Sequence, residues 1–218
     1  MNFFLNQIAS MKYFKLCLIF MVLLTSGISY SQDTELKILF IGNSLTYTND
    51  LPKLVEEVAE KQGLTIKTDI VARPEYALLD HWEDGKIQRL ISRKNYDLVI
   101  IQQGPSSQEF GKRILIEYGG KIKALCEQND TQLAYLMVWP SRRYYHTFEK
   151  LIENHREAAK INKALLIPVG EVWKKHFEAS NNFDYYGPDQ FHPSKKGSRA
   201  AAEVIASEII EWKKTNKI

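Results

Sequence analysis

The chain has 218 residues, of which 44% are hydrophobic and 25% are charged, and its formal net charge is +3. This composition is typical of a globular protein, and it excludes a disordered, collagen-like or disulfide-scaffold protein. Because the basic residues are scattered among acidic ones, we expect no nucleic-acid partner. The length suits one large domain.

The first 31 residues are predicted to be a cleavable signal peptide. Lys12 and Lys15 precede the apolar run Leu16–Leu24, and small and polar residues follow as far as Ser31. This is the order of charged, apolar and small-residue regions in a secretory signal. The run is much shorter than the ~20 residues that cross a bilayer as a helix. We therefore expect a secreted or periplasmic protein with no membrane contact after cleavage. An uncleaved membrane anchor is the alternative.

Cleavage would leave residues 32–218 as one catalytic domain with a single cysteine, Cys126. An intramolecular disulfide is then excluded, so the stability must come from the core. The domain has no C-x-x-C motif and no paired Cys/His spacing, so neither a metal site nor a cofactor is predicted. The oligomeric state is left open.

Apolar runs alternate with amphipathic stretches along this domain. Five runs are typical of buried strands: 36–41, 65–71, 97–101, 133–138 and 165–169. Helical periodicity predicts helices over 51–63, 83–92, 112–127, 146–163 and 194–212. Strands that are apolar on both faces, each followed by a helix, indicate a parallel sheet covered on both sides. The predicted fold class is α/β, a three-layer α/β/α sandwich of about five strands.

Ligands bind such sheets at the carboxyl ends of the strands. The first predicted strand is followed there by Gly42-Asn43-Ser44. A serine on a tight turn at the start of a helix can serve as a nucleophile, with free N–H groups nearby to stabilise an oxyanion. A helix-capping serine is the alternative. The Gly-x-Ser-x-Gly elbow of α/β-hydrolases is absent, because position 46 is threonine.

A second candidate motif precedes the last predicted helix. Asp189 stands three residues before His192, and Pro193 follows. The aspartate can accept the Nδ1 proton of the histidine, which leaves Nε2 free to take a proton from a nucleophile. The alternative is a loop aspartate beside a helix-capping histidine. Because Ser44 and this pair are expected on the same rim of the sheet, the sequence predicts a Ser-His-Asp triad.

The blocks Phe40–Thr46 and Asp189–Pro193 together resemble the SGNH/GDSL hydrolase family. The resemblance extends from Lys37 to the last helix. It implies a flavodoxin-like sandwich with esterase, lipase or carbohydrate deacetylase activity, in which Ser44 is the nucleophile, His192 the base and Asp189 its orienting group. Asn43, in place of the usual aspartate, is similar to secreted bacterial members of the carbohydrate-esterase type.

The middle blocks depart from the family pattern. The second strand leads into residues 72–78 without the usual oxyanion-hole glycine, so a main-chain N–H near Tyr76 is expected to serve instead. After the third strand, Ser106 stands where the family has an asparagine. The amide of Gln103 or of Gln102 can replace it as a donor. Strand alternation lets only one of the two face the site, and we favour Gln103. Glutamines that only satisfy backbone groups are the alternative.

Four residues are predicted to bind the substrate because they flank the expected site. Aromatic rings and a guanidinium there would suit a sugar ring or an acid group, although packed loops would explain them equally well. The four are Asn43, Trp139, Arg142 and Tyr186.

The sequence therefore predicts a serine ester hydrolase that works through an acyl-enzyme. Its expected substrate is a small-molecule or polysaccharide ester, from which it would remove a small acyl group such as acetyl. The main alternative is a non-catalytic carbohydrate-binding module on the same fold. A nucleotide binder ranks lower, because the loop after the first strand lacks the glycines that cradle phosphates. A metal site formed by Asp189, His192 and His81 ranks low as well.

Overall fold

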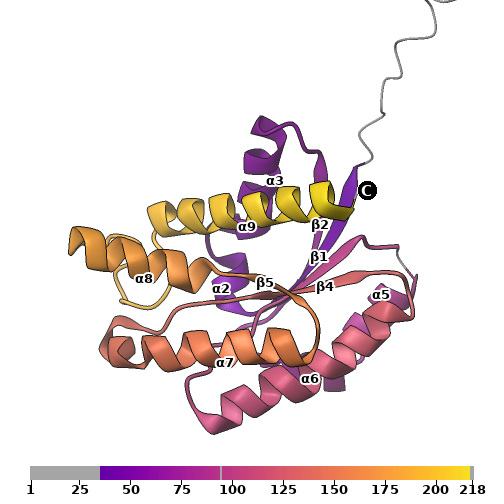
Figure 1. Cartoon of the computed structure of the whole chain (residues 1–218), viewed down its shortest axis with the longest axis horizontal. Helices are drawn as coiled ribbons and strands as arrows, with labels where there is room; N and C mark the ends of the chain where they lie inside the picture. The colour runs from indigo at the N-terminus through magenta and orange to yellow at the C-terminus, as the bar shows by residue number, and fades with distance from the viewer. Residues whose placement is uncertain (1–34, 94, 217–218) are drawn as a thin grey trace, which may run out of the picture. The chain divides into compact units, whose positions relative to one another are not determined.

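The computed structural model describes residues 35–93 and 95–216, so the predicted signal peptide lies outside the described residues. Five parallel strands form one sheet with the order β2-β1-β3-β4-β5 (Figure 1). This is the flavodoxin-like order, which changes direction between β1 and β3. The strands are β1 (Leu36–Gly42), β2 (Ile66–Ala72), β3 (Leu98–Ile101), β4 (Gln132–Leu136) and β5 (Leu165–Ile167).

Helices cover both faces of the sheet. In Figure 1, α3, α8 and α9 lie on one side and α5, α6 and α7 on the other. The three-layer α/β/α prediction is therefore confirmed. The α-helices are α2 (Ser44–Tyr47), α3 (Leu51–Lys61), α4 (Leu78–Glu83), α5 (Lys86–Arg93), α6 (Glu109–Glu127), α7 (Phe148–Ile161), α8 (Val169–Ser180) and α9 (Lys195–Asn216). Two 3₁₀ turns are η1 (Thr48–Asp50) and η2 (Arg142–Thr147).

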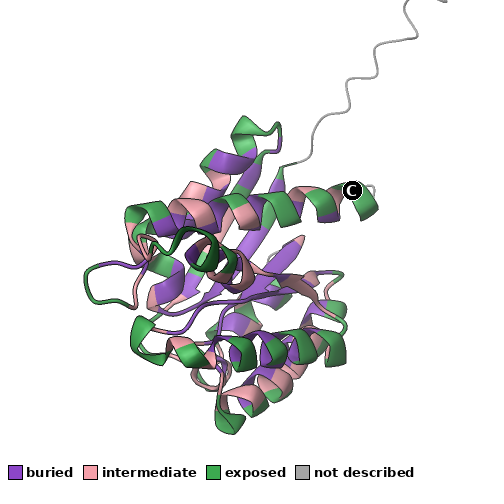
Figure 2. Cartoon of the chain, turned by 60° about the vertical axis from the view of Figure 1, so that its left-hand side comes forward, coloured by how far each residue is buried: buried purple, intermediate pink, exposed green. Residues whose placement is uncertain are grey.

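The core has two parts, one on each face of the sheet. Ile38 and Phe40 of β1 pack in the part that includes α3 and α9. Leu39 and Ile41 alternate with them and pack in the part that includes α5 and α6. The strands are accordingly buried through the centre of the molecule in Figure 2. This explains why the strands are apolar on both faces, as a covered parallel sheet requires.

Gly119 lets α6 pack close to the sheet in spite of its low helix propensity. A Cβ atom at this position would lie 1.7 Å from the Oη atom of Tyr135 in β4. That hydroxyl donates to the carbonyl of Leu115 and accepts from the Asn162 amide. The glycine inside a predicted helix thus marks the contact between the helix and the sheet.

Two helical regions differ from the sequence prediction. The helix predicted over 83–92 corresponds to α5, which begins only after Gly85, whose φ angle is +68°, and the short helix α4 before it was not predicted. Helix α8 follows Pro168 directly, and the sequence analysis did not delimit it. It buries Trp173 and Phe177 in the core. Among the described residues, no helix is both long enough and apolar enough to cross a lipid bilayer.

Candidate active site

Ser44 lies at a sharp turn between β1 and α2. A Cβ atom on Gly42 would lie 2.3 Å from Oγ1 of Thr46 and 2.5 Å from Oε1 of Gln102, so only glycine fits there. Asn43 begins the helix, because its Oδ1 accepts from the N–H of Leu45 at 3.2 Å. Its own N–H donates to Gln102 Oε1 at 2.9 Å. The turn presents Ser44 as the first residue of α2, partly open to solvent.

His81 supports the same turn from behind. Its Nε2–H donates to the carbonyl of Gly42 at 2.8 Å, and the side chain is buried. Burial lowers the pKa of His81 more than the hydrogen bond to Gly42 raises it, so the imidazole is neutral near pH 7. His81 therefore stabilises the turn through this hydrogen bond. Within the described residues, no group of three His, Cys, Asp or Glu side chains is placed to hold a metal ion.

The structure brings Ser44, His192 and Asp189 into contact. His192 Nε2 lies 2.8 Å from Ser44 Oγ, and its Nδ1 lies 2.5 Å from Asp189 Oδ2. The carboxylate can only accept, so Nδ1 carries the proton and Nε2 is the acceptor that faces the serine. This is the connectivity of a nucleophile, a general base and its orienting group.

Asp189 is fixed by its neighbours in the loop before α9. Its Oδ1 accepts from the N–H groups of Phe191 and His192 at 3.1 and 3.0 Å. Partial burial pushes the pKa of Asp189 upward, but the hydrogen bonds from His192 and from these N–H groups outweigh it and leave the pKa below its ordinary value. The Asp189 carboxylate is consequently ionised at neutral pH.

Arg142 contacts the loop that carries Asp189 and His192. Its N–H donates to the carbonyl of Gln190, and its Nη1 donates to Gln190 Oε1, each at 2.9 Å. Its guanidinium also lies over the ring of Phe183, 4.4 Å from the centroid. Gln190 has a φ angle of +61°, which a free loop would not favour. Arg142 therefore has a structural role, and its substrate contact stays a prediction.

Trp139 and Tyr186 are placed in the core, so the structure does not support the prediction that they bind substrate. Trp139 is 2% exposed and stacks on Trp173 with ring centroids 3.5 Å apart. Tyr186 is 5% exposed and donates to the carbonyl of Pro140. The two segments lie beside the site as expected, but these rings point inward. Asn43, the remaining candidate, uses its amide to cap α2 and to reach the carbonyl of Tyr76 at 3.1 Å.

The two glutamines after β3 are placed differently. Gln102 is buried, and its Oε1 accepts from Thr46 Oγ1 as well as from the N–H of Asn43, so it holds the nucleophile turn. Gln103 accepts from the N–H of Leu78 at 2.8 Å, which fixes the orientation of its amide. The Nε2 atoms of both glutamines have no hydrogen-bond partner among the described residues, but only that of Gln102 is fully buried. Gln103 is thus the better candidate for an oxyanion donor.

The segment after β2 forms a tight turn in which Glu75 takes the left-handed conformation, with a φ angle of +61°. Glycine is the usual residue for such a position. The N–H of Tyr76 donates to the carbonyl of Arg73 at 3.4 Å, and the N–H of Ala77 donates to Asp80 Oδ2. Of the main-chain donors expected near Tyr76, the N–H of Glu75 is the one without a partner in the described part of the chain.

A cavity of about 420 Å³ opens beside the triad. We call it the β3–β4 cavity, because its walls are the loops that follow these strands, together with one residue of the catalytic loop. Its lining residues are Pro105, Ser107, Gln108, Pro140, Ser141, Tyr144, Thr147 and Phe191. None of them is among the four residues predicted to bind substrate, although the sequence marks the segment after the fourth strand as a flank of the site and Phe191 lies inside the Asp189–His192 motif.

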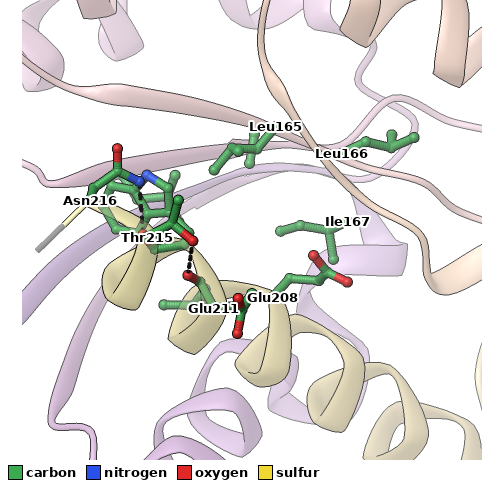
Figure 3. A pocket seen from close by; sticks show the side chains of 11 residues that line it. Leu165, Leu166, Ile167, Glu208, Glu211, Thr215 and Asn216 are labelled. Carbon is green, nitrogen blue, oxygen red and sulfur yellow. Dashed lines mark hydrogen bonds between the residues drawn. The ribbon is translucent and has the colours of Figure 1, made fainter.

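A second cavity, of about 200 Å³, lies between β5 and α9 (Figure 3). Leu165, Leu166 and Ile167 of β5 form one wall, and Glu208 and Glu211 of α9 lie at another. Its members Leu98 and Leu165 begin their strands, whereas Ser44 follows the end of β1. This cavity therefore lies toward the amino ends of the strands, whereas Ser44 lies at their carboxyl ends. It contains no residue of the triad.

Comparison with known proteins identifies which proteins have a similar fold. No family model matches the chain, and no curated protein sequence matches it. A candidate SGNH hydrolase from Slackia heliotrinireducens is 24% identical, with a TM-score of 0.70 over 81% of this chain and 100% of its own. A family 3 carbohydrate esterase from Clostridium thermocellum is 14% identical, with a TM-score of 0.65 over 84% of this chain and 98% of its own. A lipase/acylhydrolase from Enterococcus faecalis is 15% identical, with a TM-score of 0.63 over 80% of this chain and 95% of its own.

These likenesses extend over most of the described domain and nearly the whole of each solved structure. They agree with the five-stranded parallel sheet and its covering helices. The chain therefore has the fold of the SGNH/GDSL hydrolases.

Proposed function

We propose that this protein is a serine ester hydrolase that works through an acyl-enzyme. The observation that carries the proposal is the continuous path of hydrogen bonds from Ser44 Oγ through His192 to Asp189. Hydrolases and esterases among the proteins of similar fold support the same reaction class. The connected triad disfavours the alternative of a non-catalytic carbohydrate-binding module.

In the proposed reaction, Ser44 Oγ attacks the ester carbonyl and its proton moves to His192 Nε2. The oxyanion is held by the N–H of Ser44, by Gln103 Nε2 and by the N–H of Glu75. Collapse of this intermediate breaks the bond to the alcohol, which leaves with the proton from His192. Water, deprotonated by the same imidazole, then attacks the acyl-enzyme and releases the acid.

A small acyl group, such as acetyl on a carbohydrate, is the substrate that we propose. The predicted signal peptide would direct the enzyme to the periplasm or the extracellular space, where it would meet glycans. Support also comes from a carbohydrate esterase and an acetylxylan esterase among the solved structures of similar fold.

Labelling with a fluorophosphonate tests the nucleophile whatever the substrate is. We expect one label per chain, on Ser44, and hydrolysis of 4-nitrophenyl acetate by the wild type. Ser44→Ala should abolish the labelling and lower kcat on the order of 10⁴-fold. Ser180→Ala is the matched control, because that hydroxyl bonds to backbone groups at the end of α8, where it donates to the carbonyl of His176 and accepts from the N–H of Asn182. Equal rates for wild type and Ser44→Ala would refute the proposal.

A further inference from the structure

The β3–β4 cavity is connected to the catalytic base through Phe191. The ring of Phe191 lines the cavity, and its centroid lies 5.0 Å from that of the His192 imidazole. The Phe191 carbonyl accepts from Trp139 Nε1 at 3.0 Å, so the ring is carried by a backbone tied to the core. A group bound in this cavity would therefore lie beside the base in a fixed position.

The geometry of the reaction decides which half of the ester can occupy the cavity. Phe191 borders both the imidazole of His192 and the cavity. Because the leaving oxygen must take its proton from His192 Nε2, the alcohol extends past His192 toward Phe191 and into the cavity.

The lining of the cavity is apolar on its walls and polar at a few points, and it carries no charge. Phe191, Tyr144 and two prolines offer flat apolar surfaces. The side chains of Ser107, Gln108 and Ser141 have no hydrogen-bond partner within the described chain. None of the described residues that line the cavity is acidic or basic. A volume of about 420 Å³ lies within the ~300–1,000 Å³ range of small-molecule sites.

No charged side chain is among the described residues that line the cavity. Arg142 is bonded to Gln190, and Arg143 lies over the ring of Tyr144, 5.7 Å from its centroid, without lining the cavity itself. A phosphate, a carboxylate or a quaternary ammonium in the cavity would thus lose hydration without gaining a counter-ion from the lining. A neutral ring with one apolar face and several hydroxyls would satisfy both the flat walls and the free polar groups.

We propose that the β3–β4 cavity binds the alcohol half of the ester as an uncharged, hydroxyl-bearing ring of the sugar type, and that Tyr144 determines this specificity. The inference rests on the proposed hydrolase function. Tyr144 is suited to the role because it lines the cavity and is 53% exposed in the free protein. Arg143 lies against its ring, and the exposed part of the ring can stack on a ligand.

The test compares esters with one acyl group and different alcohols. The specificity ratio is kcat/KM for a mono-acetylated methyl glucopyranoside divided by kcat/KM for ethyl acetate. We expect Tyr144→Ala to lower this ratio on the order of tenfold. Tyr144→Phe should keep most of it. Phe110→Ala is the matched control, since Phe110 is an equally exposed aromatic residue that does not line the cavity.

A second pair of esters tests the charge of the alcohol. Acetylcholine and 3,3-dimethylbutyl acetate have nearly the same shape, but only the first is cationic. We expect the wild type to favour the neutral ester, and Ser141→Asp to shift the preference toward acetylcholine by roughly tenfold.

The outcomes separate the two proposals. If Ser44 is labelled and esters are cleaved, but Tyr144→Ala leaves the ratio unchanged, the cavity assignment is wrong and the hydrolase assignment stands. A wild-type preference for acetylcholine would likewise overturn the cavity assignment. If Ser44 is not labelled and no ester is cleaved, the hydrolase assignment fails first.

Discussion

Gln102 and Gln103 are adjacent in sequence, yet their side chains serve different parts of the site. Gln102 points inward and accepts two hydrogen bonds from the nucleophile turn. Gln103 accepts one from the start of α4 and keeps a free amide nitrogen. Successive side chains at a strand end point to opposite sides, so one residue can stabilise the turn while the next serves the reaction.

Gln103→Glu is expected to separate binding of the oxyanion from support of α4. The variant keeps an acceptor for the N–H of Leu78 but loses the donor and adds a negative charge. We expect kcat to fall by roughly 10²–10³-fold, with little change in the thermal midpoint. Gln103→Asn should recover part of the activity. Full activity of Gln103→Glu would exclude the amide from the oxyanion hole.

Asp189→Asn is expected to preserve the loop but to mis-orient the base. The asparagine can still accept from the N–H groups of Phe191 and His192, but it no longer stabilises an imidazolium. We expect kcat to fall by roughly 10²–10⁴-fold at an unchanged KM, measured with 4-nitrophenyl acetate. Because the Asp189 side chain is 52% exposed, the midpoint of unfolding should change little. An unaltered kcat would show that the aspartate is not part of the mechanism.

At the scale of elements, the strands were predicted well and the helices less well. A parallel strand that is covered on both faces is a short apolar run in the sequence, so β1 through β5 were all predicted from the sequence. Helix α8 was not delimited, because its role depends on Trp173 packing against Trp139, a contact between distant segments. The triad could also be predicted from the sequence, because its members lie in two short local motifs. The lining of the β3–β4 cavity has no local signature.

Gly119→Ala is expected to destabilise the protein although alanine is the better helix former. Its Cβ atom would lie 1.7 Å from Tyr135 Oη, which is itself bonded to Leu115 and Asn162. Overpacking of this kind costs about 1–3 kcal/mol or more. Gly120→Ala is the control, since its nearest contact is Asn162 Oδ1 at 3.1 Å. Urea unfolding should show the larger loss for Gly119→Ala, and equal midpoints for the two variants would contradict the packing argument.

For the whole molecule, acid stability depends on a histidine that the reaction does not use. His155 of α7 is fully buried, and its Nδ1–H donates to the carbonyl of Leu151 at 2.9 Å. Burial lowers the pKa of His155 to about 4, against a smaller upward effect of the hydrogen bond. The unfolded chain therefore takes up this proton at a higher pH than the folded chain does.

The sign of the pH dependence follows from this difference. The full stability is present above the ordinary histidine pKa of about 6.5, and it is lost progressively as the pH falls toward about 4. The free energy of unfolding should decline by about 3 kcal/mol over this range. His81, whose pKa is also lowered by burial, contributes in the same direction.

His155→Asn tests the assignment, because asparagine keeps an N–H donor and does not titrate. We expect the slope of the unfolding free energy against pH between 4 and 6.5 to become shallower, whatever the absolute stability of the variant. His146→Asn is the control, since His146 is exposed. An unchanged slope in His155→Asn would contradict the prediction.

The stacked pair of Trp139 and Trp173 gives the molecule a built-in optical reporter. Two indoles with centroids 3.5 Å apart and planes inclined by 12° are close enough for their electronic transitions to couple. The Nε1–H of Trp139 also bonds to the backbone of Phe191, next to the base. A split circular dichroism band from this pair would thus follow the seating of the catalytic loop in the unlabelled protein, with no substrate present.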